Sequence, residues 1–176
     1  MSGADDTAVF PIEEWSDRIR SLRNSFHCGS DALDTYIRTQ ASQDVAKKFC
    51  SLFAAVDREV PAIAGFYTLS MYSVNLSDVP SSMRKKIPRY PLVPAVLLGR
   101  LAIDCRYQKI GLGEDLLLDA MNRLINNDIA WWAIVVSAKE GSSDFYLRYG
   151  FQQFRDSPDQ LFLPHKTVIE GLRQNS

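Results

Sequence analysis

A glycine-containing turn is the clearest candidate binding element in this sequence. Gln108, Gly111 and Gly113 stand between an apolar run that ends at Ile103 and a segment with helical periodicity. Successive backbone N–H groups at the start of a helix can cradle an anion such as a phosphate. The spacing fits neither a P-loop nor the three-glycine dinucleotide fingerprint. The pattern therefore indicates either a phosphate site or a tight turn before a helix.

A second candidate is the aromatic segment around Tyr146. Residues 142–149 have the pattern of a short helix, and Gly150 follows as its C-terminal stop. The phenol of a tyrosine can protonate a basic leaving group, so Tyr146 is a candidate general acid. The alternative is that these aromatic side chains only fill the core. We find no compelling general base; Glu140 is close in sequence, but a solvated loop residue is the stronger interpretation.

Charge is distributed unevenly along the chain. Seven basic residues and one acidic residue lie between Arg84 and Lys109, although the whole chain has a net charge of −1. The basic residues of the proline-rich part of this stretch are Arg84, Lys85, Lys86 and Arg89. Such a local basic patch favours a nucleic-acid backbone, and the alternative is a solvated charged loop.

Composition excludes several classes of protein. The chain has 176 residues, of which 46% are hydrophobic and 23% charged, as expected for one globular domain. Three cysteines and two histidines are too few and too scattered for a disulfide framework or a metal site. Cys105 could be a nucleophile, but only His27 and His165 could activate it, so we expect a buried, inert thiol. No apolar run is long enough to span a membrane, and the polar N-terminus does not resemble a signal peptide. We therefore expect a cytoplasmic protein without a metal.

Hydrophobic periodicity predicts the order of elements that must position these residues. About twenty irregular residues should precede an amphipathic helix, a β-hairpin, and a long loop with a short helix near Met83. A buried strand, a helix, a strand, a short helix and two strands should follow. The predicted ranges are 31–45 for the first helix, 49–56 and 62–71 for the hairpin, 73–94 for the loop, then 95–103, 113–127, 131–136, 142–149, 151–154 and 161–163. The strand–helix–strand segment implies a parallel crossover, and hence an α/β mixed sheet with helices on both faces.

Taken together, these segments resemble the GNAT family of acetyl-CoA-dependent N-acetyltransferases. The family motif Arg/Gln-x-x-Gly-x-Gly/Ala is matched by Gln108, Gly111 and Gly113, and an aromatic box by Phe145-Tyr146 with Gly150-Phe151. The resemblance implies the GNAT fold over a single domain at 26–166, between an acidic segment at 1–25 and a tail at 167–176. It also implies acetyl-CoA as the acetyl donor, with Tyr146 as the acid that protonates the departing thiolate. The implied cofactor-binding residues are Leu101, Ala102, Ile103, Gln108, Lys109, Ile110, Gly111, Leu112 and Gly113.

A narrower resemblance points to the GNAT toxins of bacterial toxin–antitoxin modules. It rests on Cys28-Gly29 with Leu33-Asp34, on the basic loop that leads into residues 98–104, and on the aromatic box. Lys109 stands where these toxins commonly have a glycine, and Ile110 where they have a basic residue. The resemblance implies acetylation of the free α-amine of aminoacyl-tRNA, which blocks translation, and neutralisation by a ribbon–helix–helix antitoxin. It also suggests a homodimer, with Arg84, Lys85, Lys86 and Arg89 contacting the tRNA.

Two other functions fit the sequence. One is a GNAT enzyme that acetylates a small-molecule amine or a protein amine. The other is a non-catalytic binding module that has kept the fold, which a failure to bind acetyl-CoA would favour.

Overall fold

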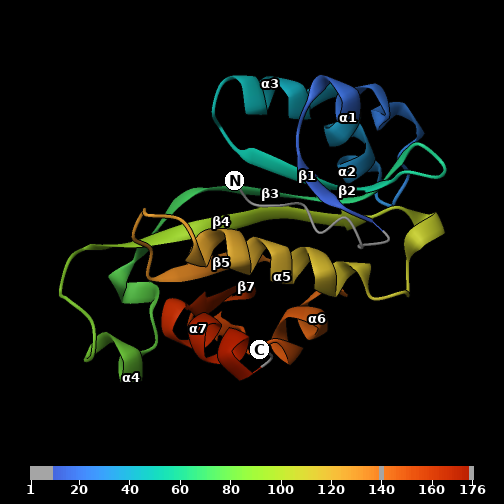
Figure 1. Cartoon of the computed structure of the whole chain (residues 1–176). Helices are drawn as coiled ribbons and strands as arrows, with labels where there is room; N and C mark the ends of the chain where they lie inside the picture. Colours follow the sequence, from blue (N-terminus) through green and yellow to red (C-terminus); the bar gives the residue numbers. More distant parts are fainter. Residues whose placement is uncertain (1–9, 139–140, 175–176) are drawn as a thin grey trace. The chain divides into compact units, whose positions relative to one another are not determined.

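The computed structural model describes residues 10–138 and 141–174 (Figure 1). Contacts within the chain form two compact units. The first consists of Met1–Leu69 and Arg100–Leu124, and the second of Ser70–Gly99 and Ile125–Ser176. The strands follow one another in the order β1-β2-β3-β4-β5-β7-β6, and the long strands β3 and β4 contribute residues to both units. The predicted mixed sheet is confirmed.

The bounds of the elements agree with most of the predicted ranges. The strands are β1 (Ile12–Glu14), β2 (Ser51–Asp57), β3 (Ala62–Asn75), β4 (Leu92–Ile103), β5 (Ala133–Ser137), β6 (Gln152–Phe154) and β7 (Ser157–Pro164). The helices are α1 (Asp17–Ser21), α2 (Asp31–Thr35), α3 (Ala41–Ala46), α4 (Ser81–Arg84), α5 (Leu112–Ile125), α6 (Ser143–Arg148) and α7 (His165–Gln174). The short helix predicted near Met83 is therefore present as α4.

In the first unit, the predicted helix at 31–45 is confirmed with one local change. A π-helical turn, Tyr36–Gln40, separates α2 from α3. Ile37 and Ala41 are fully buried in a core that also holds Phe26 and Phe66. The apolar stripe that predicted the helix is thus the side that packs against the hairpin strands.

The hairpin of the first unit has the antiparallel pairing that its sequence predicts. Residues Ser51–Asp57 of β2 pair with residues 62–69 of β3, with one irregularity after Ala55. Gly65 of β3 is required by close packing. A Cβ at this position would lie 2.9 Å from Ile103 Cδ1 and 3.0 Å from the Ala102 carbonyl oxygen. The glycine therefore lets β3 approach the end of β4, where the candidate cofactor residues lie.

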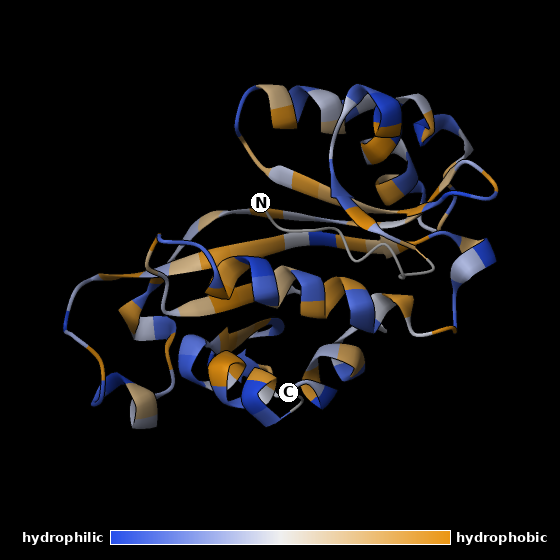
Figure 2. Cartoon of the chain, in the orientation of Figure 1, coloured by the Kyte–Doolittle hydropathy of each residue, from blue (hydrophilic) through white to orange (hydrophobic). Residues whose placement is uncertain are grey.

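The second unit has its own core on the C-terminal strands. β4 pairs with β5 in parallel from Ala95 to Leu98, and β7 pairs antiparallel with both β5 and β6. Helices α6 and α7 contact β7, and Figure 2 shows hydrophobic and hydrophilic residues alternating along α7. The buried apolar cluster consists of Val74, Val79, Val93, Ala95, Ala133, Val135, Phe154 and Phe162.

Two predictions about the ends of the chain were wrong. The first twenty residues were predicted to be irregular, but from Ile12 the chain is ordered. Strand β1 pairs with β2, and Ile19 of α1 is 0% exposed. The segment predicted as a C-terminal tail from residue 167 lies largely in helix α7, which begins at His165. A three-residue strand and a five-residue helix are too short to produce a periodic signal, and they become stable only by packing on the rest of the first unit. The boundaries at 26 and 166 stay predictions.

Within the described ranges, no helix is both long and apolar enough to cross a membrane.

Candidate functional site

The turn from β4 into α5 has the backbone geometry of an anion cradle. Gly111 has φ +88°, and the N–H of Asp115 donates to the Gly111 carbonyl oxygen at 3.2 Å, so the helix begins directly after this glycine. The N–H groups of Leu112, Gly113 and Glu114 then have no acceptor inside the helix. A Cβ at Gly111 would meet no described atom within 4 Å. The turn therefore offers free donors beside open space, as a phosphate group requires.

Lys109 is the second residue of this turn with a left-handed backbone, and its φ is +64°. Gly113 does not share this conformation, because it lies in the first turn of α5. Left-handed backbone is unfavourable for a residue with a Cβ. Lys109 and Ile110 are both exposed, so the ammonium group of Lys109 is free to meet a ligand at the turn.

The side chain of Gln108 is hydrogen-bonded to the protein's own backbone. Its side-chain Nε2 donates to the carbonyl oxygens of Ile103 at 3.0 Å and Cys28 at 3.2 Å. These two bonds connect the end of β4 to the loop before α2. Cys105 lies beside this amide and is exposed, so the prediction of a buried thiol was wrong.

A buried aspartate fixes the start of the turn. Asp104 is 1% exposed and accepts hydrogen bonds from the backbone N–H of His27 at 3.0 Å and of Arg106 at 2.9 Å. The guanidinium of Arg106 also donates to both carboxylate oxygens. Burial alone would raise the pKa of Asp104, but the hydrogen bonds from Arg106 and His27 lower it below its usual value. The turn is thus stabilised by a charged, fully bonded group.

A second buried acid, Asp34, lies under the loop before α2. Its carboxylate accepts from the N–H of Cys28 at 2.8 Å and lies 2.7 Å from Nδ1 of the exposed His27 ring. Burial opposes ionisation, but these bonds hold the pKa of Asp34 below its usual value. In the sequence, Asp34 stands out only through the resemblance to the GNAT toxins. Its place on the apolar stripe with Ile37 and Ala41 was the available signal, because a buried acid requires partners.

In the second unit, Tyr146 on α6 has a buried ring and an unbonded hydroxyl group. The residue is 7% exposed, and its ring makes edge contacts with Phe145 at 5.1 Å and Phe151 at 5.3 Å. No hydrogen bond joins its hydroxyl to another described residue. Burial raises the pKa of Tyr146 to about 12, so the phenol stays protonated at neutral pH. The ring is therefore part of the core, and the role of the hydroxyl as a general acid stays a prediction.

The four basic residues of the loop do not share one environment. Lys85, Lys86 and Arg89 are exposed, whereas Arg84 is half-buried and its Nε has no partner among the described residues. The loop is anchored at Met83, which packs on the core of the second unit. The structure therefore displays three cations on a fixed loop.

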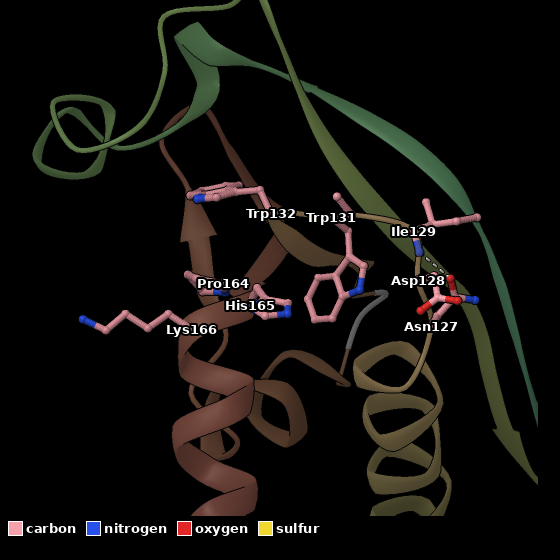
Figure 3. Close-up of a pocket in the computed structure, with 9 residues that line it drawn as sticks. Asn127, Asp128, Ile129, Trp131, Trp132, Pro164, His165 and Lys166 are labelled. Carbon is pink, nitrogen blue, oxygen red and sulfur yellow. Dashed lines mark hydrogen bonds between the residues drawn. The ribbon is translucent and has the colours of Figure 1, made fainter. Parts of the chain in front are cut away.

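A pocket of the second unit lies between the start of β5 and the start of α7 (Figure 3). It is about 490 Å³ in volume. The Trp131 ring makes an edge contact with the His165 ring at 4.5 Å, and both line the pocket. None of the predicted site residues lies there. Glu140 lies outside the described residues, and the described part of the chain holds no group of three metal-ligating side chains.

The comparisons with curated proteins identify relatives of this chain. Residues 94–161 match the acetyltransferase (GNAT) domain family. A tRNA-acetylating toxin of Mycobacterium tuberculosis is 34% identical over 79% of this chain and 83% of its own length. A protein of Sinorhizobium fredii named "Probable toxin TacT" is 25% identical over 94% of this chain and 97% of its own length.

Solved structures of GNAT toxins have a fold similar to that of this chain. AtaT in complex with acetyl-methionyl-tRNAfMet has a TM-score of 0.84 and 30% identity, covering 93% of this chain and 99% of that one. AtaTR bound with acetyl-CoA has a TM-score of 0.79 and 27% identity, covering 93% and 98%. A tyrosine-to-phenylalanine mutant of the toxin AtaT, bound to the C-terminus of the antitoxin AtaR, has a TM-score of 0.76 and 25% identity, covering 93% and 98%. The chain therefore belongs to the GNAT acetyltransferases, within the family of tRNA-acetylating toxins.

Proposed function

We propose that this protein is a toxin that transfers the acetyl group of acetyl-CoA to the free α-amine of aminoacyl-tRNA and so blocks translation in the cytoplasm. The observation that carries this proposal is the likeness over nearly the whole chain to AtaT in complex with an acetylated aminoacyl-tRNA. A different fold, or a likeness limited to the acetyl-CoA turn, would not have indicated which molecule accepts the acetyl group.

The turn before α5 supports acetyl-CoA as the donor. The N–H groups of Leu112, Gly113 and Glu114 suit the diphosphate of the cofactor. The positive helix end adds attraction, against which stand the carboxylates of Glu114 and Asp115 in the first turn. Acetyl-CoA supplies an acyl thioester that an amine can attack directly. We assign the backbone of Leu101–Ile103 to holding the pantetheine arm. Gln108 contributes by fixing the loop before α2 to the end of β4.

Tyr146 is the proposed general acid. Its hydroxyl remains protonated because burial raises its pKa to about 12, so it has a proton to deliver at neutral pH. Solved structures of the relatives KacT and AtaT carry one tyrosine replaced by phenylalanine, and this choice of variant is consistent with a role for a tyrosine hydroxyl. The α-amine of an aminoacyl ester needs little help to lose its proton, since free α-amines titrate near pH 8.

Lys85, Lys86 and Arg89, with Arg84, are proposed to contact tRNA phosphates. Such contacts position a nucleic acid without reading its sequence. An antitoxin is the proposed protein partner, on the likeness to the AtaT–AtaR complex. That this antitoxin is of the ribbon–helix–helix type, and that the toxin forms a homodimer, stay predictions.

The test of the tRNA acceptor is a comparison of two pairs of lysines. Lys85→Ala/Lys86→Ala should weaken binding of charged tRNA and lower the salt slope of log K by about 0.7–0.9 per lost phosphate contact. The control Lys47→Ala/Lys48→Ala removes another exposed pair of lysines, in the first unit, and should leave the slope unchanged. Labelled acetyl-CoA then measures transfer to charged tRNA, with the toxin alone. No transfer to charged tRNA, together with transfer to a small or protein amine, would favour the rival acetyltransferase.

A further inference from the structure

The basic loop carries a large aromatic side chain that the core does not use. Tyr90 is 70% exposed, although it follows Arg89 directly and lies between two prolines. No acidic residue occurs from Val79 to Ile103. The ring is therefore displayed in a segment whose charged groups are all cations.

The backbone around this ring is fixed rather than free. Met83 and Ile87 pack against the apolar cluster of the second unit, which includes Val79 and Val93 on the two sides of the loop. The N–H of Leu76 donates to the Pro91 carbonyl oxygen at 3.0 Å and joins the two ends of the loop. A proline after Tyr90 also restricts that residue to extended backbone. A rigid loop loses little conformational entropy when a ligand covers it.

We propose that Tyr90 is a stacking platform for an unpaired base at the 3′ end of aminoacyl-tRNA, with the neighbouring cations on the adjacent phosphates. This inference rests on the proposed function, because it takes charged tRNA as the substrate. Aromatic side chains beside basic residues are the usual means by which proteins bind single-stranded RNA, since every base presents a π-face. Stacking positions the end of the RNA, so Tyr90 is a positioning residue and takes no part in the chemistry.

The charge around the ring favours RNA over a second copy of this chain. Lys85, Lys86 and Arg89 are exposed and make no ion pair with a described residue. Phosphates on both sides of a stacked base would neutralise these cations. A second copy of this chain would instead bring the same cations together, and like charges oppose that contact.

The test separates the ring from the charge. Tyr90→Leu removes the aromatic face and keeps apolar bulk, whereas Tyr90→Phe keeps the ring. With uncharged and charged tRNA, we expect Tyr90→Leu to bind about 5- to 100-fold more weakly, with the salt slope unchanged, and Tyr90→Phe to retain binding. Lys85→Ala, by contrast, should lower the salt slope of log K, because it removes a phosphate contact. Ile129→Ala, which removes another exposed apolar side chain of the second unit, should have no effect.

A fluorescent probe locates the contact. Charged tRNA with 2-aminopurine in place of an unpaired acceptor-end base should be quenched by the wild-type protein and by Tyr90→Phe, but less by Tyr90→Leu. Wild-type-like quenching and affinity in a folded Tyr90→Leu protein that binds acetyl-CoA normally would overturn the stacking role. The proposed function would survive that result, because wild-type acetylation of charged tRNA is measured separately and fails only if the substrate is wrong.

Discussion

Replacing Lys109 with glycine should stabilise the protein, because Lys109 has φ +64°. Left-handed backbone costs a residue with a Cβ about 1–2 kcal/mol. The greater freedom of glycine in the unfolded chain offsets about 0.4–1 kcal/mol of that gain. The net expectation is an increase of about 0.5–1 kcal/mol in the free energy of unfolding. For a chain of this length, that increase corresponds to a rise in Tm of about 1–4 °C.

Lys109→Ala is the matched control, since it removes the same side chain but keeps the unfavourable φ. Urea titration should give the glycine variant a higher free energy of unfolding than the alanine variant. Equal stability of the two variants would refute the assignment of backbone strain to this position.

The same pair of variants tests the ligand contact of Lys109. If the ammonium group contacts a phosphate of acetyl-CoA, the glycine and alanine variants should lose affinity equally by calorimetry, and Lys109→Arg should keep it. A loss in the alanine variant alone would show that the shape of the turn matters and the charge does not.

Three further results are expected. Gly111→Asp adds a charged side chain in left-handed backbone beside the free N–H groups, so calorimetry should show no acetyl-CoA binding, and unchanged affinity in a folded variant would contradict the cradle. Tyr146→Phe should reduce turnover roughly 10²–10⁴-fold with acetyl-CoA affinity unchanged; because burial raises this pKa to about 12, the wild-type rate should not fall between pH 7 and 9. Asp34→Ala leaves the Cys28 N–H unpaired and should cost about 1–3 kcal/mol of stability by urea titration. Because the folded-state pKa of Asp34 is lowered, its contribution is complete above the unfolded value and is lost as pH falls below about 4, whereas the alanine variant should lack that loss.

Local sequence patterns were sufficient for most of the fold. The hairpin, the strand at residues 95–103 and the helix after Gly111 follow from periodicities that each segment carries by itself. The tight turn at Gly111 was predictable for the same reason, since its residues are neighbours in the chain, and phosphate binding there stays a prediction. The resemblance in the motifs then identified the acetyltransferase family.

Short elements could not be predicted in this way. β1 has three residues, and it is a strand because β2 offers a partner. The ten-residue helix that begins at His165 is different, because it is amphipathic and contacts β7, so its helical periodicity was an available signal. The three-residue strand gains its stability from contacts with distant residues, so its own sequence contains little signal.

The details of the site depended on tertiary structure most of all. That the Gln108 amide bonds to the Cys28 carbonyl, 80 residues away in sequence, follows from the topology and from no motif. The same holds for the bond between the His27 N–H and Asp104. By itself, the sequence determined which residue types are available for binding and proton transfer. Only the tertiary structure decided which of them are used internally, because a buried polar group must find its partners wherever the fold brings them.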